Sequence, residues 1–270
     1  VIFSPVYLAY NKRLFDESTV AYPNENWVKE DYIRAFQKLT IDTNRDGIID
    51  QYGLSLSTSF ARWPIIPLQF GVDFKNKTDE NTLYRALDFI HDLVYRYKIA
   101  TLSPANILNS NAFFYEKAAM VLTTAIEMAG WRNNKIPFTP KVTPVSFGEF
   151  YRTLLVGNIF MIPSISKKQE LAAKFIETAL SKKFQMDIYK QYHFLSVLKS
   201  VNESESDHKK LTVFRLIDNE IKNGFFLHQI ISDFALIDEL ESEMQLYWAG
   251  LESAESFASR IGEIFGANKH

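Results

Sequence analysis

Apolar residues recur along this chain with two spacings, and the change from one to the other predicts which segments are strands and which are helices. Short β-prone apolar runs predict strands at residues 6–10, 54–56, 119–123 and 157–162. Apolar stripes and their flanking residues predict helices at 11–15, 27–39, 80–97, 111–117, 167–180, 211–222, 227–248 and 253–265. Strands that alternate with helices and then give way to a helical C-terminal region predict an α/β protein.

Polar residues just before three of these helices predict where each one begins. Asn26 is a suitable N-cap for the helix at 27–39, and Thr78 or Asp79 for the helix at 80–97. Ser166, with Gln169 three residues later, matches the capping-box pattern. The helix that follows is expected to bury its apolar face, formed by Leu171, Ala172, Phe175, Ile176, Ala179 and Leu180.

The composition limits the size and the class of the protein. With 270 residues, of which 47% are hydrophobic, the chain has enough apolar material for two lobes. Its net charge of -2 and its scattered Lys and Arg provide no basic stripe, which argues against nucleic-acid binding. The sequence has no uncharged apolar run long enough to predict a transmembrane helix, and no leader peptide is recognised. The absence of cysteine excludes disulfides, thiolate metal sites and cysteine nucleophiles, without fixing the compartment.

One polar loop has the residue types of a calcium site. The oxygen donors of an EF-hand-like loop would be Asp42, Asn44, Asp46, the backbone carbonyl of Ile48, and Asp50. Gly47 takes the position where such a loop turns sharply, but Gly53 stands where the bidentate Glu is normally found. A structural calcium ion is one interpretation, and a metal-free turn held by Asx hydrogen bonds is the other.

Several segments follow one another like the motifs of a known family. Tyr10–Asp16 resembles "YNKxLF", and Asp42–Gly53 resembles "D-x-DGDG-x-x-DxYG". The segment Arg62–Pro64 stands where the family has an aromatic residue followed by "xWP". Phe114–Met120 resembles "F-x-x-GKAAM", and Ile162–Phe175 resembles "I-x-x-x-SK-x-x-x-AA-x-F". In this order and spacing, the chain resembles the extracellular solute-binding proteins, the family that includes maltose-binding protein.

The chain also departs from the family pattern. Glu116 replaces the usual Gly, and residues 191–199 lack the Gly and Pro of the family's return segment. Family members carry a long segment before "YNK" that builds most of the first lobe, whereas only a few residues precede Tyr10 here. The resemblance therefore implies a type II periplasmic-binding-protein-like fold, with two α/β lobes, a hinge, and a first lobe that is incomplete at the N-terminus. It assigns residues 11–156 mainly to the complete lobe, 157–192 to part of the incomplete lobe, and 193–270 to a helical region that contributes to both.

The same resemblance implies a function. The implied protein is an extracytoplasmic binding component, in the periplasm or on the cell surface. It binds a sugar or oligosaccharide in a cleft between the lobes and delivers it to an ABC permease. We expect a monomer that requires no cofactor, with a structural calcium ion as the one interpretation left open above. Any membrane attachment would be through a lipid anchor upstream of Val1.

Aromatic rings that stack on sugar faces, and carboxylates that bond sugar hydroxyls, are the candidates for ligand contact. By their place in the family pattern these are Phe60, Trp63, Trp131 and Phe234, together with Glu127. For each ring the alternative is ordinary packing between helix and sheet, and for Glu127 it is a solvated surface carboxylate.

Two other functions are weighed against solute binding. A glycoside hydrolase could use a spaced pair of carboxylates, but the sequence has no nucleophile elbow, no "HExxH" and no phosphate-binding glycine loop. A truncated, binding-incompetent remnant or interaction protein of the same fold is the second alternative. It follows from the expected incomplete lobe, which would expose apolar surface.

Overall fold

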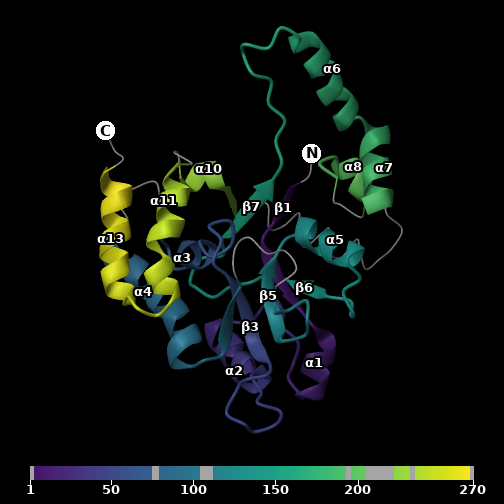
Figure 1. Cartoon of the computed structure of the whole chain (residues 1–270). Helices are drawn as coiled ribbons and strands as arrows, with labels where there is room; N and C mark the ends of the chain where they lie inside the picture. Colours follow the sequence, from purple (N-terminus) through teal and green to yellow (C-terminus); the bar gives the residue numbers. More distant parts are fainter. Residues whose placement is uncertain are drawn as a thin grey trace.

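The computed structural model of this chain describes residues 3–74, 79–103, 112–192, 196–204, 222–231 and 235–267. Figure 1 shows two α/β parts, which we call the larger lobe, built on a five-stranded sheet, and the smaller lobe, built on a three-stranded sheet. None of the helices in the described part combines the length and the apolar character that a membrane span requires.

The larger sheet has parallel strands at its centre. Its strand order is β4-β3-β5-β2-β6, with β2 at Tyr7–Tyr10, β3 at Tyr52–Ser57, β4 at Ala100–Ser103, β5 at Ala118–Thr123 and β6 at Lys141–Thr143. Strand β3 runs parallel to β4 and β5, and β2 runs antiparallel to β5 and β6. Every residue of β5 is buried, and its side chains reach two different apolar cores, Met120 and Leu122 one and Val121 between them the other. The unbroken apolar run of β5 is therefore that of a strand covered on both faces.

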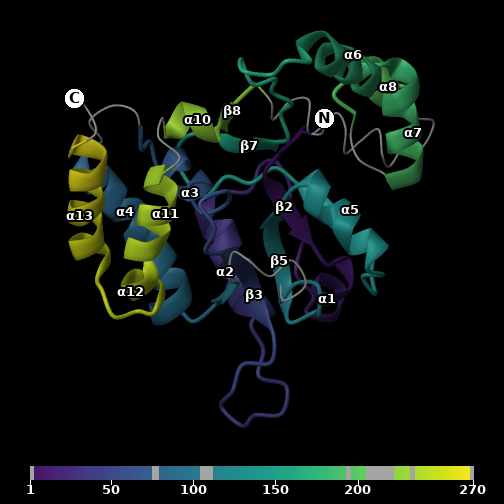
Figure 2. The same cartoon turned by 45° about the horizontal axis from the view of Figure 1, so that its top comes forward.

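Helices cover the larger sheet. They are α1 (Lys12–Glu17), α2 (Lys29–Leu39), α3 (Ile65–Gln69), α4 (Glu80–His91, continued by a π-helical turn at Asp92–Arg96), α5 (Ala125–Asn133), α11 (Ala235–Glu243), α12 (Gln245–Trp248) and α13 (Ala254–Ala267). Helix α13, at the C-terminal end of the chain, lies beside α4 (Figures 1 and 2). The C-terminal helices thus complete the core of the larger lobe.

The smaller lobe contains three strands that leave or enter the larger lobe. Its sheet has the order β1-β7-β8, formed by Phe3–Pro5, Thr153–Gly157 and Gly224–Phe226. Strand β7 pairs antiparallel with β1 and parallel with β8. Its helices are α6 (Gln169–Leu180), α7 (Lys182–Tyr192), α8 (Lys199–Asn202) and α10 (Leu227–Ile230).

The chain passes between the lobes at neighbouring places. The first crossing is at Val6, whose N–H donates to the carbonyl of Leu154 at 2.8 Å and whose carbonyl accepts the hydroxyl of Thr153 at 2.5 Å. The N–H of Thr153 donates in turn to the carbonyl of Asn223, which precedes β8, at 3.1 Å. The starts of β2, β7 and β8 therefore lie side by side and are held together by these hydrogen bonds.

Gln69, at the end of α3, fixes the second connection to the larger lobe. Its fully buried amide nitrogen donates to the carbonyls of Val145 and Arg152, at 2.8 and 2.9 Å. Its amide oxygen accepts the N–H of Phe147 at 2.7 Å. A Cβ atom on Gly148 would come within 2.1 Å of the Gln69 carbonyl oxygen, so the two backbones touch. The segment before β7 is therefore part of the larger lobe up to Arg152.

Several elements expected from the sequence are confirmed. The strands expected at 6–10, 54–56 and 119–123 are present as β2, β3 and β5. The helix expected at 11–15 is present as α1, which begins at Lys12, with Asn11 as the N-cap that accepts the N–H of Arg13 at 3.0 Å. The cap expected at Asp79 forms, because its side chain accepts the N–H of Thr82 at 3.1 Å. The final helix is present as α13.

Two expected helix starts are wrong. The helix expected to begin after Asn26 begins at Lys29, because the Asp31 carboxylate accepts the N–H of Val28 at 3.0 Å, while Asn26 belongs to a turn made by Asn24. The capping box expected at Ser166 and Gln169 does not form. The Gln169 side chain donates instead to the carbonyl of Ser164 at 2.8 Å, and α6 begins at Gln169 itself.

The apolar segment around α6 also differs from expectation. The strand expected at 157–162 does not form, because β7 ends at Gly157, the last of its residues to pair with β1. Of the six α6 side chains expected to be buried, only Ala179 is, and Leu171 and Phe175 are 63% and 62% exposed. The described elements leave this apolar face uncovered, so the helical stripe marks a surface that they do not pack against.

Three further expectations are wrong in part or fall outside the described residues. The helix expected at 227–248 is broken into α10, α11 and α12. The helix expected at 111–117 is a turn over 112–116, which ends with Glu116 in the left-handed region at φ 58°. Residue 111, and the helix expected at 211–222 up to residue 221, lie outside the described part of the chain.

We expect Gln69→Leu to destabilise the protein by about 3 kcal/mol, because two buried carbonyls and one buried N–H lose their partner. Urea unfolding measures the loss. The control is Gln37→Leu, an exposed glutamine on α2, which should stay within about 0.5 kcal/mol of the parent. Equal effects of the two substitutions would show that Gln69 does not fix the connection.

Candidate functional site

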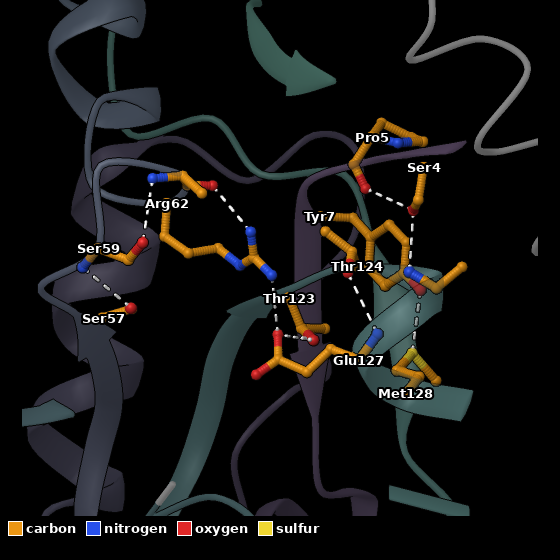
Figure 3. Close-up of polar contacts among 12 residues, drawn as sticks. Ser4, Pro5, Tyr7, Ser57, Ser59, Arg62, Thr123, Thr124, Glu127 and Met128 are labelled. Carbon is orange, nitrogen blue, oxygen red and sulfur yellow. Dashed lines mark hydrogen bonds and ion pairs between the residues drawn. The ribbon is translucent and has the colours of Figure 1, made fainter. Parts of the chain in front are cut away.

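Polar side chains gather where β3 and β5 end. Because these strands are parallel, with Leu54 opposite Met120, their carboxyl ends at Ser57 and Thr123 lie at the same edge of the sheet. That edge faces the smaller lobe (Figures 1 and 3). In open α/β sheets ligands commonly bind just outside the carboxyl ends of the strands. We therefore take this edge as the candidate site.

An ion pair lies at the centre of the site. Arg62 follows β3 and Glu127 lies in the first turn of α5, and their side chains meet at 3.2 Å (Figure 3). Each side chain is only 15% exposed, so the pair is poorly screened by solvent. The hydroxyl of Thr123 donates to the same Glu127 oxygen, Oε2, at 2.8 Å. Within the described part of the chain, the second carboxylate oxygen of Glu127 has no hydrogen-bond partner.

Hydroxyl groups and one carboxylate shape the loop that carries Arg62. The Ser57 hydroxyl accepts the N–H of Ser59, and the Ser59 hydroxyl accepts the N–H of Ala61, both at 3.2 Å. Glu241, from α11, accepts the N–H of Phe60 at 3.0 Å. The guanidinium of Arg62 donates back to the Ala61 carbonyl at 2.8 Å. These bonds hold the arginine in one position before any ligand arrives.

The start of α5 is fixed from both lobes. The Thr124 hydroxyl accepts the N–H of Glu127 at 3.3 Å, which caps the helix. Ser4, in β1 of the smaller lobe, accepts the N–H of Ala125 at 2.9 Å. The site therefore lies where the two lobes touch.

Tyr7 supports α5 from β2. It is buried and its hydroxyl contacts the Met128 sulfur at 3.1 Å (Figure 3). Burial, with a smaller contribution from the negative charge of Glu127, raises the pKa of Tyr7, while the charges of Arg132 and Arg62 oppose that rise. Tyr7 is therefore a neutral, structural part of the site.

Of the four ligand-contact candidates that lie within the described residues, the structure brings Glu127 alone into this polar cluster. Phe60 and Trp63 lie on the same loop as Arg62, but both rings are 1% exposed and pack edge to face at 5.6 Å. Trp131 is 2% exposed and packs on Phe113 at 5.4 Å. These three rings turn into the cores, so in this structure they offer no face to a ligand, and direct contact by them stays a prediction.

The remaining candidate, Phe234, lies outside the described residues. Arg62, Thr123 and Thr124 are site residues that the sequence patterns did not single out. Their signal in the sequence was their place at the end of an expected strand or in the segment after it, where hydroxyl and charged side chains follow an apolar run.

The loop with the calcium-type pattern is a turn in which Asx side chains accept hydrogen bonds from the loop's own backbone. Both carboxylate oxygens of Asp42 accept backbone N–H groups, from Arg45 at 2.6 Å and Gly47 at 2.8 Å. Asn44 and Asp46 each accept the N–H two residues further on, at 3.0 and 2.8 Å. These are the Asx hydrogen bonds of the metal-free interpretation.

The far end of the loop closes in the same way. Asp50 accepts the N–H and the hydroxyl of Thr43, and these bonds, the hydroxyl bond most of all, lower the pKa of Asp50. Gly53 donates its N–H to the Thr40 hydroxyl at 3.0 Å and brings no carboxylate. Among the described residues no group of three or more His, Asp or Glu side chains is arranged to hold a metal ion. Calcium binding by this loop, with Ile48 as carbonyl donor, stays a prediction.

Comparison with known proteins places these observations in a family. The model of the bacterial extracellular solute-binding proteins matches residues 2–213. No curated protein sequence matches the chain significantly.

Solved structures match the fold. The maltose/maltodextrin-binding domain from Bdellovibrio bacteriovorus, bound to maltotriose, is 20% identical with a TM-score of 0.77, over 99% of this chain and 71% of that one. A solute-binding protein of an ABC transporter from Thermotoga lettingae, bound to α-D-tagatose, is 18% identical with a TM-score of 0.81, over 98% and 70%. A Mycobacterium tuberculosis protein in complex with glycerophosphocholine is 14% identical with a TM-score of 0.79, over 98% and 69%. The expected type II periplasmic-binding-protein fold is thus confirmed.

We expect Asp42→Ala to lower the melting midpoint by about 2–4 °C, because two backbone N–H groups of the turn lose their acceptor. The loss should be the same in EDTA and in calcium, as measured by differential scanning fluorimetry. Asp187→Ala, an exposed aspartate on α7, is the control and should not change the midpoint. A calcium-dependent rise of the midpoint that disappears in Asp42→Ala would instead establish the ion.

Proposed function

Because the chain belongs to the bacterial extracellular solute-binding protein family, we propose that it captures a sugar or oligosaccharide outside the cytoplasm and delivers it to the permease of an ABC importer. The single observation that carries this proposal is the polar cluster at the carboxyl ends of β3 and β5, at the junction of the two lobes. The solutes bound in the similar solved structures include maltotriose and tagatose, which supports a carbohydrate ligand.

The groups at this edge suit a polyhydroxylated ligand. Ser57, Ser59 and Arg62 are partly exposed, and the second oxygen of Glu127 is available as an acceptor. Sugar hydroxyls both donate and accept, so they can bond to a carboxylate and a guanidinium at once. The ligand would thus add hydrogen bonds to groups that the loop already holds in place, which limits the entropy lost on binding.

The two neighbouring connections at Val6 and Thr153 support a hinge. Two lobes joined by a few side-by-side strands can rotate towards one another around a ligand at their junction. Ser4 and Thr153 lie at the roots of two of these strands, and Ser4 bonds directly to the start of α5. Closure would therefore be transmitted to the site through β1 and α5. The function we propose is binding and delivery, without catalysis, by a cell-surface lipoprotein or periplasmic protein that acts as a monomer.

The uncovered face of α6 favours a second candidate function, that of an interaction protein of the same fold. A groove of about 500 Å³ lies along α6 between apolar side chains that include Met161, 84% exposed, and Phe175. Exposed apolar surface of this kind is typical of protein contact sites. Absence of heat from every sugar, together with concentration-dependent association in light scattering, would favour this candidate over solute binding.

Calorimetry with a panel that includes maltotriose and tagatose tests the proposed function, and we expect saturable heat from at least one sugar. The double variant Arg62→Ala/Glu127→Gln should bind that sugar at least about tenfold more weakly, since it loses a charged donor and a charged acceptor without leaving either charge unpaired.

The matched control is Arg13→Ala/Glu116→Gln. Arg13 and Glu116 also form an ion pair, at 2.7 Å. It lies at the amino end of β5, the end opposite to the candidate site. This control should keep the affinity of the parent. An equal loss in both double variants would count against the site at Arg62.

A further inference from the structure

The ion pair at the candidate site has a consequence for the charge of its ligand, which rests on the proposed function. Family and fold leave this charge open, because the ligands bound in the similar solved structures include neutral sugars and the phosphodiester glycerophosphocholine. The decision must therefore come from residues of this chain.

We propose that the Arg62–Glu127 ion pair makes the site select neutral polyhydroxylated solutes against anionic ones, with Glu127 as the specificity-determining residue. A lone arginine in such a place would attract phosphate or carboxylate, since the guanidinium fork matches both geometries. Here the guanidinium meets a carboxylate at 3.2 Å before any ligand arrives. An entering anion would have to approach that carboxylate as well.

The pair is held too firmly for Glu127 to move aside. The carboxylate accepts from the Thr123 hydroxyl and stands in the first turn of α5, where the helix N-terminus favours a negative charge. The guanidinium is fixed on the other side by the Ala61 carbonyl. Since both side chains are only 15% exposed, solvent ions screen the repulsion of an anion weakly.

Other charges near the site do not restore an anion site. Glu241, which bonds the Phe60 N–H, adds a second carboxylate to the loop. Arg132 reaches Tyr7 electrostatically, but it is an exposed residue at the end of α5, where solvent screens its charge. Arg62 is therefore the cation whose availability decides whether an anion can bind here.

Glu127→Gln tests the proposal because it removes the negative charge and keeps an acceptor for Thr123 and Arg62. The first probe is sodium sulfate, compared with sodium chloride at the same ionic strength in a thermal-shift measurement. We expect sulfate to raise the melting midpoint of Glu127→Gln and to leave the unmodified protein unchanged. The added substitution Arg62→Gln should abolish the sulfate effect, which assigns that effect to the freed guanidinium.

The second probe is a set of neutral sugars paired with their uronic acids, glucose with glucuronate and galactose with galacturonate, in calorimetry beside maltotriose and tagatose. We expect Glu127→Gln to bind the uronates at least about tenfold more tightly than the unmodified protein does. Glu116→Gln, which makes the same change in the Arg13 ion pair, is the control and should behave like the parent.

The possible outcomes separate the proposal from the function on which it rests. Sulfate stabilisation of the unmodified protein equal to that of Glu127→Gln would overturn the proposal, as would equal affinity of the unmodified protein for uronates and neutral sugars. A sulfate effect confined to Glu127→Gln, with no heat from any sugar, would overturn sugar binding while leaving Glu127 as the group that excludes anions.

Discussion

The parallel pairing of β3 with β5 is the constraint on which the rest of the structure depends. It brings together Arg62 and Glu127, which are 65 residues apart in sequence, because each follows the carboxyl end of its strand. The pairing is secured by complete burial of β5 between two apolar cores. A shift of one residue in its register would turn Met120 and Val121 to the wrong cores, so hydrophobic burial also fixes the position of the site.

The smaller lobe depends on the larger one through the connections at Val6 and Thr153. Hydrogen bonds hold Val6, Thr153 and Asn223 together at the point where β7 pairs with β1 and β8. Gln69 extends the rigid part of the larger lobe up to this point. The bending region is therefore short, which is the condition for two lobes to rotate as units rather than deform.

Local sequence chemistry predicted the elements whose stability is local. Asp79 could be recognised as a cap because it bonds the N–H of Thr82, only three residues away. The errors arise where tertiary contacts decide. Ser166 and Gln169 have the composition of a capping box, but a carbonyl at Ser164 takes the glutamine amide instead. An apolar stripe likewise shows that α6 is amphipathic without showing what covers it.

The same limit explains the candidate site. Sequence position identified the loop after β3 and the start of α5, and it selected Glu127, but it also selected the rings of Phe60 and Trp63. Adjacent residues in a tight turn point in different directions, and which of them faces the core depends on partners such as Trp248, which packs against Trp63 at 6.3 Å. The buried rings and the direction of the arginine are linked, since anchoring Phe60 and Trp63 in the core leaves Arg62 directed at Glu127. The rings thus position the charged pair, and on the proposed function a solute at this edge would meet the pair before it met an aromatic face.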